Sequence, residues 1–345
     1  MTAATFLSDS WRWLGAHSSY DRLPGYVRQL DGSVRVTVAP PRFMSRLSRL
    51  LDTQPLHRRR HWGYYPGSDR AFVRQLNARP ATVGHILYFE RHHRMLARWR
   101  DIPQTIVATL HFRPSPDAQP RFYQDLRRLP AAIVLYQRDL AFFTECLDSR
   151  RVMFIRHGVD TEFFTPAPTA AQGPRRLLYI GVNRRDIHML REVVRRLAES
   201  TDLRFDFVVP RGRHLLRDLE RCPQIHWHHN ISDDQLRMLY RNSYLLLLPL
   251  TASGANNAVV EALACALPPV TTDVGGIRDY GGGTLYPVVA PHDAEAMVRV
   301  VQEYLRDPER RQQVGRDCRA FAEQCLSWRT VAEQHLRFYR QLLNG

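Results

Sequence analysis

The loop TASGANN at residues 251–257 combines small polar residues with a carboxylate one helical turn further on, Glu261. The apolar run YLLLLPL before it is typical of a buried parallel strand, and the apolar spacing from Asn257 to Ala266 predicts a helix. The amides at the start of that helix form an anion site, where a phosphate or a sugar hydroxyl can dock. A buried Glu261 requires hydrogen-bond donors, and two ribose hydroxyls would supply them. The pattern alone equally allows Glu261 to cap the helix or to face solvent.

The residues from Ser253 to Gly276 resemble the donor-site motif of the family 4 retaining glycosyltransferases, which have the GT-B fold. That motif has two acidic residues eight apart, a Gly-x-x-Asn segment, Glu-Ala-x-Ala-x-x-x-Pro and a Thr-Asp-x-Gly-Gly turn. Here Glu261 is the second acid, and Ser253 stands in place of the first. The other matching residues are Gly254, Ala255, Asn256, Asn257, Ala262, Ala264, Pro268, Thr272, Asp273, Gly275 and Gly276. The resemblance implies that Glu261 holds the nucleotide ribose and that the contact of the first acid with the donor sugar is altered.

A second resemblance lies in IRHGVDTEFFTPAP, residues 155–168. It is similar to the family's Asn-Gly-Val-Asp-x-x-x-Phe-x-Pro signature, with His157 in place of the Asn. The signature marks the last strand of the first domain and the exit into a linker. The Pro-rich segment PAPTAAQGP that follows is typical of such a linker.

The turn after residues 175–180 begins at Gly181. In the family this turn reads Gly-Arg-x-x-x-x-Lys-Gly, and its Arg and Lys neutralise the donor diphosphate. This chain has no lysine, so Arg184 and Arg185 are the candidate substitutes. Arg185 is favoured because it directly precedes Asp186, a good helix N-cap, which places it at the end of the loop. The alternative is two exposed arginines. The resemblance also places the nucleobase near His229.

In the first half of the chain, His111 ends the strand-like run TIVATLH. Ligands collect at the carboxyl ends of strands in open α/β sheets. A lone His is usually structural, but the family places a His after a comparable strand, next to the donor sugar and the acceptor. In the loop after the first strand, Gly15, Ser18 and Ser19 are small enough to admit a substrate, although an ordinary surface turn would look the same.

The formal charge of +15 comes from arginine alone. The lack of lysine excludes a phosphate-loop lysine, a Schiff base and attachment of pyridoxal phosphate, whereas Arg still binds phosphate bidentately. Five cysteines without a CxxC pair predict free thiols. The run HWHH suggests a metal, but strand alternation sends only His226 and His228 to one face and no further ligand has suitable spacing. No GxGxxG follows a candidate first strand, which argues against a dinucleotide oxidoreductase.

Two basic stretches with interleaved aromatic residues, HRRRHWGYYPG at 57–67 and RHHRMLARWR at 91–100, allow three interpretations. The preferred interpretation is a solvated face, and the second is contact with an anionic membrane surface. Nucleic-acid binding comes last, because no nucleic-acid module is present. The N-terminus lacks the features of a signal peptide and no run approaches eighteen apolar residues. We therefore expect a cytoplasmic protein, with peripheral membrane association as a second expectation.

Strand-length apolar runs alternate with helical or polar stretches along the whole chain, which predicts parallel sheets with crossover helices. Together with the resemblance, this implies an α/β protein of the GT-B class, with two Rossmann-like domains facing each other across a cleft. We expect an acceptor-side domain at 1–166, a linker at 167–174 and a nucleotide-sugar domain at 175–327. A last helix at 328–345 is expected to cross back onto the first domain.

The resemblance implies a retaining, metal-independent transfer of a sugar from a UDP- or GDP-sugar to a saccharide or lipid-linked acceptor. No cofactor and no nucleic-acid partner are expected. His111, Arg185 and Glu261 are the expected catalytic residues, and the other donor-binding residues are Gly15, Ser19, Gly181, Arg184, His229, Ser253, Gly254, Ala255, Asn256 and Asn257. Two alternatives stay open. One is a non-catalytic GT-B protein that binds a nucleotide sugar or an anionic polymer, and the other is a sugar-nucleotide epimerase, which would need acid and base carboxylates.

Overall fold

The computed structural model describes residues 3–9, 17, 19–31, 33–39, 66–78, 82–99, 102–103, 105–111, 113, 120–147, 151–168, 173–200, 202–209 and 213–344. The chain folds into two compact units. Unit 1 comprises residues 1–14, 19–157 and 328–345, and unit 2 comprises residues 15–18 and 158–327. Each unit contains a six-stranded sheet whose described neighbours all pair in parallel.

The sheet of unit 1 has the order β2-β1-β3-β4-β5-β6. Its strands are β1 Ala3–Asp9, β2 Val34–Ala39, β3 Thr82–Ile86, β4 Ile106–Leu110, β5 Ala131–Val134 and β6 Val152–Phe154. The described helices are η1 Tyr20–Arg22, α1 Leu23–Asp31, α3 Pro66–Asn77, α4 Phe89–His92, η3 His93–Arg98, α5 Pro120–Leu126, η4 Gln137–Asp139, α6 Leu140–Leu147 and α12 Trp328–Asn344. Every residue of β3, β4 and β5 is buried, as expected for central parallel strands covered on both faces.

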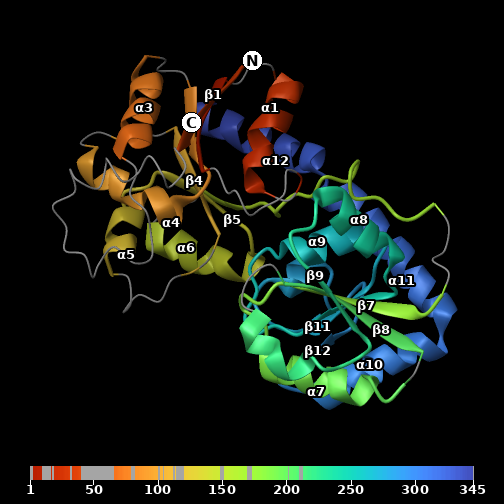
Figure 1. The fold of residues 1–345 in the computed structure, drawn as a ribbon. Coiled ribbons are helices and arrows are strands. Elements are labelled where there is room, and N and C mark those ends of the chain that lie inside the picture. The colour runs from red at the N-terminus through yellow and green to blue at the C-terminus, as the bar shows by residue number, and fades with distance from the viewer. Residues whose placement is uncertain are drawn as a thin grey trace. The chain divides into compact units, whose positions relative to one another are not determined.

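The sheet of unit 2 has the order β12-β11-β10-β7-β8-β9. Its strands are β7 Arg175–Ile180, β8 Leu203–Val208, β9 Ile225–His228, β10 Leu245–Leu248, β11 Pro269–Thr272 and β12 Val288–Val289. The described helices are α7 Ile187–Leu197, η5 Arg213–Leu219, α8 Asp233–Asn242, α9 Asn257–Ala264, η6 Ile277–Tyr280, α10 Ala294–Arg306, α11 Pro308–Phe321 and the π-helical turn η7 Ala322–Leu326. Helices α7 and α10 cover one face of this sheet, and α8, α9 and α11 cover the other (Figure 1). Unit 2 is therefore doubly wound.

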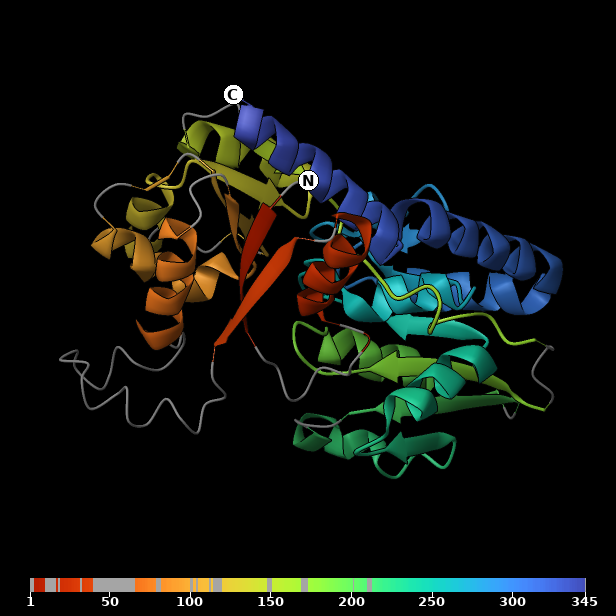
Figure 2. The ribbon, with the colours of Figure 1, turned by 90° about the horizontal axis from the view of Figure 1, so that it is seen from above.

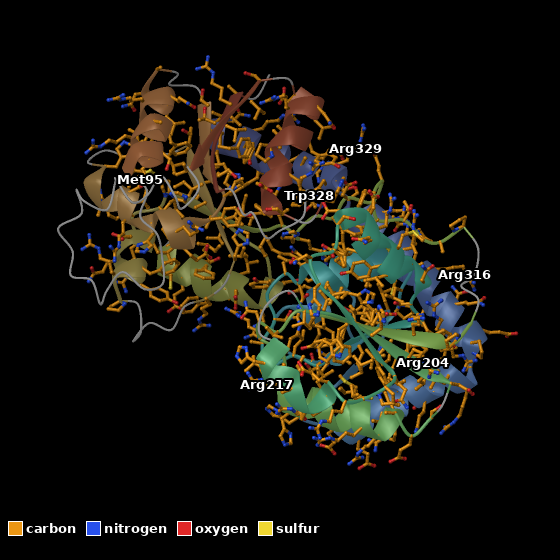
Figure 3. All side chains as sticks on the ribbon, in the orientation of Figure 1. Met95, Arg204, Arg217, Arg316, Trp328 and Arg329 are labelled. Atoms are coloured by element: carbon orange, nitrogen blue, oxygen red, sulfur yellow. The ribbon has the colours of Figure 1, made fainter. Side chains whose placement is uncertain are left out.

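The last helix, α12, belongs to unit 1, where it packs against α1 and β3 (Figures 1 and 2). It starts with Trp328, which is buried in unit 1, while Arg329 points outward (Figure 3). The periodic apolar residues of α12 form its buried face, as the sequence pattern predicts for an amphipathic helix.

The segment that follows His157 packs within unit 2, although the sequence grouped it with the first domain up to residue 166. Phe164 is fully buried there, 5.8 Å from the ring of Tyr240. Arg319 donates from Nη1 to the carbonyl of Phe164 at 2.8 Å, and Arg241 donates from Nε to the carbonyl of Thr165 at 2.8 Å. These contacts lie between residues far apart in sequence, so the linker composition does not reveal them.

Candidate functional site

Helix α9, which carries Glu261, follows β10 along the chain and packs against β11. The side chain of the N-cap residue Asn256 accepts a hydrogen bond from the amide of Ala258 at 3.1 Å, which fixes the start of the helix. Glu261 is 4% exposed, so its carboxylate does not face solvent. Its Oε2 accepts a hydrogen bond of 2.7 Å from the hydroxyl of Tyr240 on α8. Burial, followed by the nearby Glu261, raises the pKa of Tyr240, so this hydroxyl stays a donor.

The loop between β10 and α9 is held on one side by the loop that follows β7. Arg185 forms an antiparallel bridge with Leu250, and the amide of Thr251 donates to the carbonyl of Arg184 at 3.1 Å. The amide of Asp186 donates to the carbonyl of Pro249 at 3.0 Å. Asp186 also caps α7 through the amide of Met189. The two loops therefore form one backbone unit at the carboxyl edge of the sheet.

The turn after β11 holds the same loop from the other side. Thr272 Oγ1 accepts from the amide of Leu250 at 2.9 Å and donates to its carbonyl at 2.7 Å. Gly275 has φ +61°, and a Cβ at this position would lie 1.9 Å from the carbonyl oxygen of Ser253. Only glycine permits this approach. The Thr-Asp-x-Gly-Gly motif thus has a direct structural role, because it sets the position of Ser253.

Arg185 is a half-buried cation in the loop that follows β7. Its Nε donates to the carbonyl of Ile180 at 2.9 Å and its Nη1 to the carbonyl of Asn183 at 3.1 Å. Its Nη2 lies against Gly181, which has φ +75°. Burial lowers the pKa of Arg185, and no carboxylate of the described residues forms an ion pair with it. A partly desolvated charge without a counter-ion favours the binding of an anionic ligand. Arg184, in contrast, is exposed, at φ +57°.

The other donor-side residues are placed as follows. Ser253 is 8% exposed, and its Oγ donates to the carbonyl of Gly254 at 2.7 Å, so the hydroxyl faces its own loop. Residues 254–257 are half-buried along the loop and the first turn of α9. His229 follows β9 and is exposed. It is set apart from Gly181, which follows β7, because β8 lies between these two strands. Unit 2 therefore brings together Gly181, Arg185, the 253–257 loop and Glu261, with His229 further along the same edge.

His111 follows β4 at the carboxyl edge of the sheet of unit 1. Its Nε2 bonds the carbonyl of Leu87 at 2.8 Å, and its amide donates to Glu90 Oε1 at 2.5 Å. The imidazole stacks on the ring of Tyr88 at 4.7 Å and 14°. Ser19 is buried, and its Oγ lies 3.3 Å from the hydroxyl of Tyr88, the ring that stacks on His111. Gly15 and Ser18 lie outside the described residues.

Of the histidines of β9, His228 bonds a carboxylate of the neighbouring strand. The rings of His226 and His228 lie 4.5 Å apart, but His228 Nε2 bonds Asp206 Oδ1 at 2.8 Å, and Asp206 also pairs with Arg176 at 3.1 Å. Across the described ranges, no group of three or more His, Cys, Asp or Glu residues is arranged to hold a metal ion. No helix in the described part of the chain is long and apolar enough to cross a bilayer.

The basic stretch at 91–100 is partly a core segment. His92 and His93 are buried, and they bond Asp69 at 2.8 Å and Asp125 at 2.7 Å. Met95 and Leu96 are buried as well. The expectation of a solvated face is therefore wrong for these residues, because α4 and the 3₁₀ helix η3 turn them inward. Residues 57–65 of the other basic stretch lie outside the described residues.

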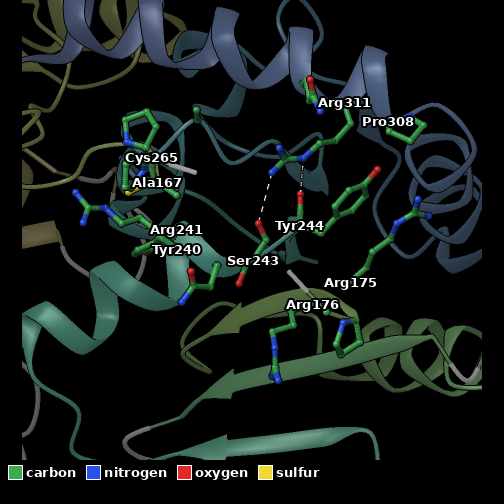
Figure 4. A pocket seen from close by; sticks show the side chains of 17 residues that line it. Ala167, Arg175, Arg176, Tyr240, Arg241, Ser243, Tyr244, Cys265, Pro308 and Arg311 are labelled. Carbon is green, nitrogen blue, oxygen red and sulfur yellow. Dashed lines mark hydrogen bonds between the residues drawn. The ribbon is translucent and has the colours of Figure 1, made fainter. Parts of the chain in front are cut away.

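A cavity of about 290 Å³ lies at the opposite, amino edge of the sheet of unit 2, where β7 begins (Figure 4). Its arginines do not converge on the space. Arg311 points toward the carbonyls of Ser243 and Tyr244, while the heads of Arg176 and Arg241 turn away toward Asp206 and Thr165 (Figure 4). The cavity lining includes Tyr240, the partner of Glu261, but neither Arg185 nor Glu261 itself.

Sequence reasoning missed Tyr240 as the partner of Glu261. Helix α8 places Tyr240 one turn after Leu236, on the same face. Burial of the Tyr is therefore predictable, but its hydrogen bond to a residue 21 positions away is not. It also missed a buried polar cluster around Tyr20 and His335 in unit 1, whose members are scattered over the whole chain.

Two units with parallel six-stranded sheets, with the last helix belonging to unit 1, define a protein of the GT-B class. The sucrose-phosphate synthase from Thermosynechococcus elongatus superposes with a TM-score of 0.74 at 17% identity, covering 98% of this chain and 99% of that chain. Anabaena Alr3699/HepE in complex with UDP gives a TM-score of 0.72 at 15% identity, covering 99% and 100%. At these identities the likeness shows the fold.

Residues 174–307 match the family model described as Glycosyl transferases group 1. The likeness to this family lies in this segment, which belongs to unit 2. Among curated proteins, it is 26% identical over 199 residues to the MMP alpha-(1->4)-mannosyltransferase of Mycolicibacterium hassiacum, covering 54% of this chain and 47% of the relative. The chain thus spans about half the length of this relative.

Proposed function

We propose that this protein is a retaining glycosyltransferase that moves a sugar from a nucleoside-diphosphate donor to a saccharide or lipid-linked acceptor. The observation that carries the proposal is Arg185, a half-buried cation that forms no ion pair with a carboxylate of the described residues. It lies in a loop bonded to the loop that opens α9. The family match and the name of the mannosyltransferase relative support the reaction class, and the UDP complex of a protein with the same fold supports the type of donor.

The diphosphate is proposed to bind at the carboxyl edge of the sheet of unit 2. The amides at the start of α9 present positive partial charge there, and Arg185 adds a full charge with N–H groups that its two carbonyl partners do not use. Both groups are fixed before the donor arrives, so they stabilise the charge that develops on the leaving diphosphate. The proposed reaction therefore includes no divalent-metal requirement.

Glu261 is proposed to bind the ribose. Tyr240 donates to one carboxylate oxygen, and an ionised carboxylate has about four acceptor positions, so ribose hydroxyls add to this bond rather than replace it. The hydrogen bond from Tyr240 fixes the rotamer of Glu261 before the donor binds. The burial of Glu261 strengthens each charge-assisted bond that the carboxylate makes.

At the sugar, the proposed reaction proceeds on one face. Ser253 provides no carboxylate, and its hydroxyl already donates to Gly254, so it does not act as a nucleophile. The acceptor oxygen forms a bond to the anomeric carbon as the bond from that carbon to the diphosphate breaks. The acceptor proton passes to the departing phosphate oxygen. His111 is proposed to contact the sugar and the acceptor through the side of its imidazole that is not bonded to Leu87.

The proposal is tested by incubating the protein with a panel of UDP- and GDP-sugars and acceptors, with and without EDTA, and measuring the release of UDP or GDP. Replacing Arg185 by Gln removes a charge-assisted contact worth about 1.5–3 kcal/mol, so kcat/KM for the donor should fall roughly ten- to a hundredfold or more. The matched control is Arg184→Gln, which removes an exposed charge from the same loop. Equal effects of the two substitutions would refute the assignment of Arg185.

A non-catalytic binder is the second candidate, and the hydroxyl of Ser253 favours it because it bonds its own loop. If the protein is a non-catalytic binder, a nucleotide sugar binds in a way that depends on Arg185 but is not cleaved in the presence of any acceptor. Isothermal titration alongside the release assay separates the two functions.

A further inference from the structure

Unit 1 contains a continuous line of five buried polar side chains, which we call the relay: Tyr339, His85, Thr109, Tyr20 and His335. Tyr20 is 1% exposed and the other four are fully buried. The hydroxyl of Tyr339 lies 2.5 Å from His85 Nδ1, and His85 Nε2 lies 2.8 Å from Thr109 Oγ1. Thr109 Oγ1 lies 3.2 Å from the hydroxyl of Tyr20, which lies 2.9 Å from His335 Nε2. The relay joins β3, β4, η1 and α12.

One carbonyl group sets the direction of every hydrogen bond in the relay. His335 Nδ1 faces the carbonyl oxygen of Val331 at 2.8 Å, and a carbonyl can only accept, so Nδ1 carries the hydrogen. In the neutral ring Nε2 is then an acceptor, and Tyr20 donates to it. Thr109 therefore donates to Tyr20, His85 Nε2 donates to Thr109, and Tyr339 donates to His85 Nδ1. Each imidazole carries one hydrogen, so the relay is complete only when both rings are neutral.

Burial keeps the relay neutral. It lowers the pKa of His335 to about 4 and the pKa of His85 well below its usual 6.5. Burial also raises the pKa of Tyr20 and of Tyr339 above their usual 10.0. Near neutral pH, the hydroxyl of Tyr20 therefore has one donor and one acceptor partner within the relay. It is turned toward His335 and takes no part in a proton transfer at the site.

The ring of Tyr20 contacts His111. The two ring centroids lie 5.0 Å apart at 84°, while Tyr88 stacks on the same imidazole. His111 is thus held by two aromatic rings and by its bond from Nε2 to Leu87. Tyr20 also lies against the rings of His157 and Trp328, at 5.3 and 5.6 Å. A shift of Tyr20 would be transmitted directly to His111.

We propose that Tyr20 is a positioning residue for His111, and that the relay fixes Tyr20 in its place. The inference rests on the proposed function only for the role of His111 in sugar transfer. If the contacts served only to attach α12, apolar residues of similar volume would do so without the desolvation of five polar groups. A network in which every member is satisfied, by contrast, fixes side-chain positions uniquely.

The experiment compares Thr109→Val, Thr109→Ser and Thr105→Val. Val is close to Thr in shape, so Thr109→Val removes the hydroxyl that links His85 to Tyr20, and Thr109→Ser keeps it. Thr105→Val is the matched control, because Thr105 donates to the carbonyl of Thr82 at 3.0 Å, just before the same strand and outside the relay. Tyr20→Phe retains the ring and removes its hydroxyl, and it serves if Thr109→Val does not fold.

Two readouts are taken on the full chain. With ¹⁵N-histidine labelling, NMR reports the tautomer and the environment of His111, whose signals are assigned with His111→Gln. Steady-state kinetics separate kcat from the KM of the donor. We expect Thr109→Val to move the signals of His111 and to lower kcat about tenfold while the donor KM stays within about twofold, since orientation rather than donor binding is lost. Thr109→Ser and Thr105→Val should leave both readouts close to those of the native chain.

The inference is overturned if Thr109→Val and Tyr20→Phe fold and leave the signals of His111 unchanged. It is also overturned if Thr105→Val moves those signals as much as Thr109→Val does. If the native chain transfers no sugar but His111 still responds to Thr109→Val alone, the positioning holds and the proposed function fails. The two failures are therefore distinguishable.

Discussion

Replacing Gly275 by Ala tests the placement of the loop between β10 and α9. The added Cβ would lie 1.9 Å from the carbonyl oxygen of Ser253, whereas ordinary contact begins near 3.4 Å. Ser253 must therefore move by more than an ångström, or the turn must. Two terms add in the folded state: about 1–2 kcal/mol for a Cβ at φ +61° and roughly 1–3 kcal/mol for overpacking. We expect unit 2 to lose about 2–5 kcal/mol of its free energy of unfolding.

The matched control for Gly275→Ala is Gly173→Ala. Gly173 has φ +96°, but a Cβ there meets nothing within 4 Å, so this substitution isolates the backbone strain from the overlap. It should cost about 1–2 kcal/mol and leave activity unchanged. A misplacement of about 1 Å can lower turnover roughly a hundredfold, so Gly275→Ala should reduce kcat/KM for the donor by about that factor. Denaturant unfolding and donor titration measure the two effects. Equal behaviour of the two variants would show that Gly275 does not set the position of Ser253.

Three further predictions follow from single contacts. Tyr240→Phe removes the hydrogen bond of 2.7 Å to Glu261, so the Kd of the nucleoside diphosphate should rise about tenfold or more. An unchanged Kd in a titration would show that Tyr240 does not contribute to donor binding. Arg319→Met removes three hydrogen bonds to the carbonyls of Ala264, Phe164 and Thr161, so the free energy of unfolding of unit 2 should fall by several kcal/mol. A loss below about 1 kcal/mol in denaturant unfolding would show that these bonds do not stabilise unit 2. The pKa of His335 falls from 6.5 to about 4 on folding, so the unfolded chain binds the extra proton in this window. His335 should therefore remove about 3 kcal/mol of the stability of unit 1 as pH falls from 6.5 to 4, and His85, whose pKa is lowered as well, adds to this loss. His335→Gln should flatten that dependence, and a slope equal to that of the native chain would contradict it.

Backbone requirements account for the part of the fold and site that the sequence could predict. Apolar runs of strand length predicted the buried parallel strands, and the family resemblance predicted the GT-B class, which the structural neighbours confirm. The small residues of the 251–257 loop and the glycines of the turn after β11 leave visible signals, because a helix start and a close backbone approach demand particular residue types. The same logic failed for the linker signature, whose Phe164 packs in unit 2, since composition does not show which core a side chain enters.

The relay shows why the remaining part escapes a sequence-based analysis. Val331, His335 and Tyr339 recur every four residues, which predicts that they share one face of the last helix. Because a buried polar group requires a partner, burial of that face implies that partners for His335 and Tyr339 exist. Their identity is fixed only when the sheet assembles, because Tyr20 and His85 lie 315 and 254 positions away. Sequence spacing can therefore predict that a hydrogen bond must form without predicting its partner, and the candidate positioning residue for His111 is found only in the folded unit.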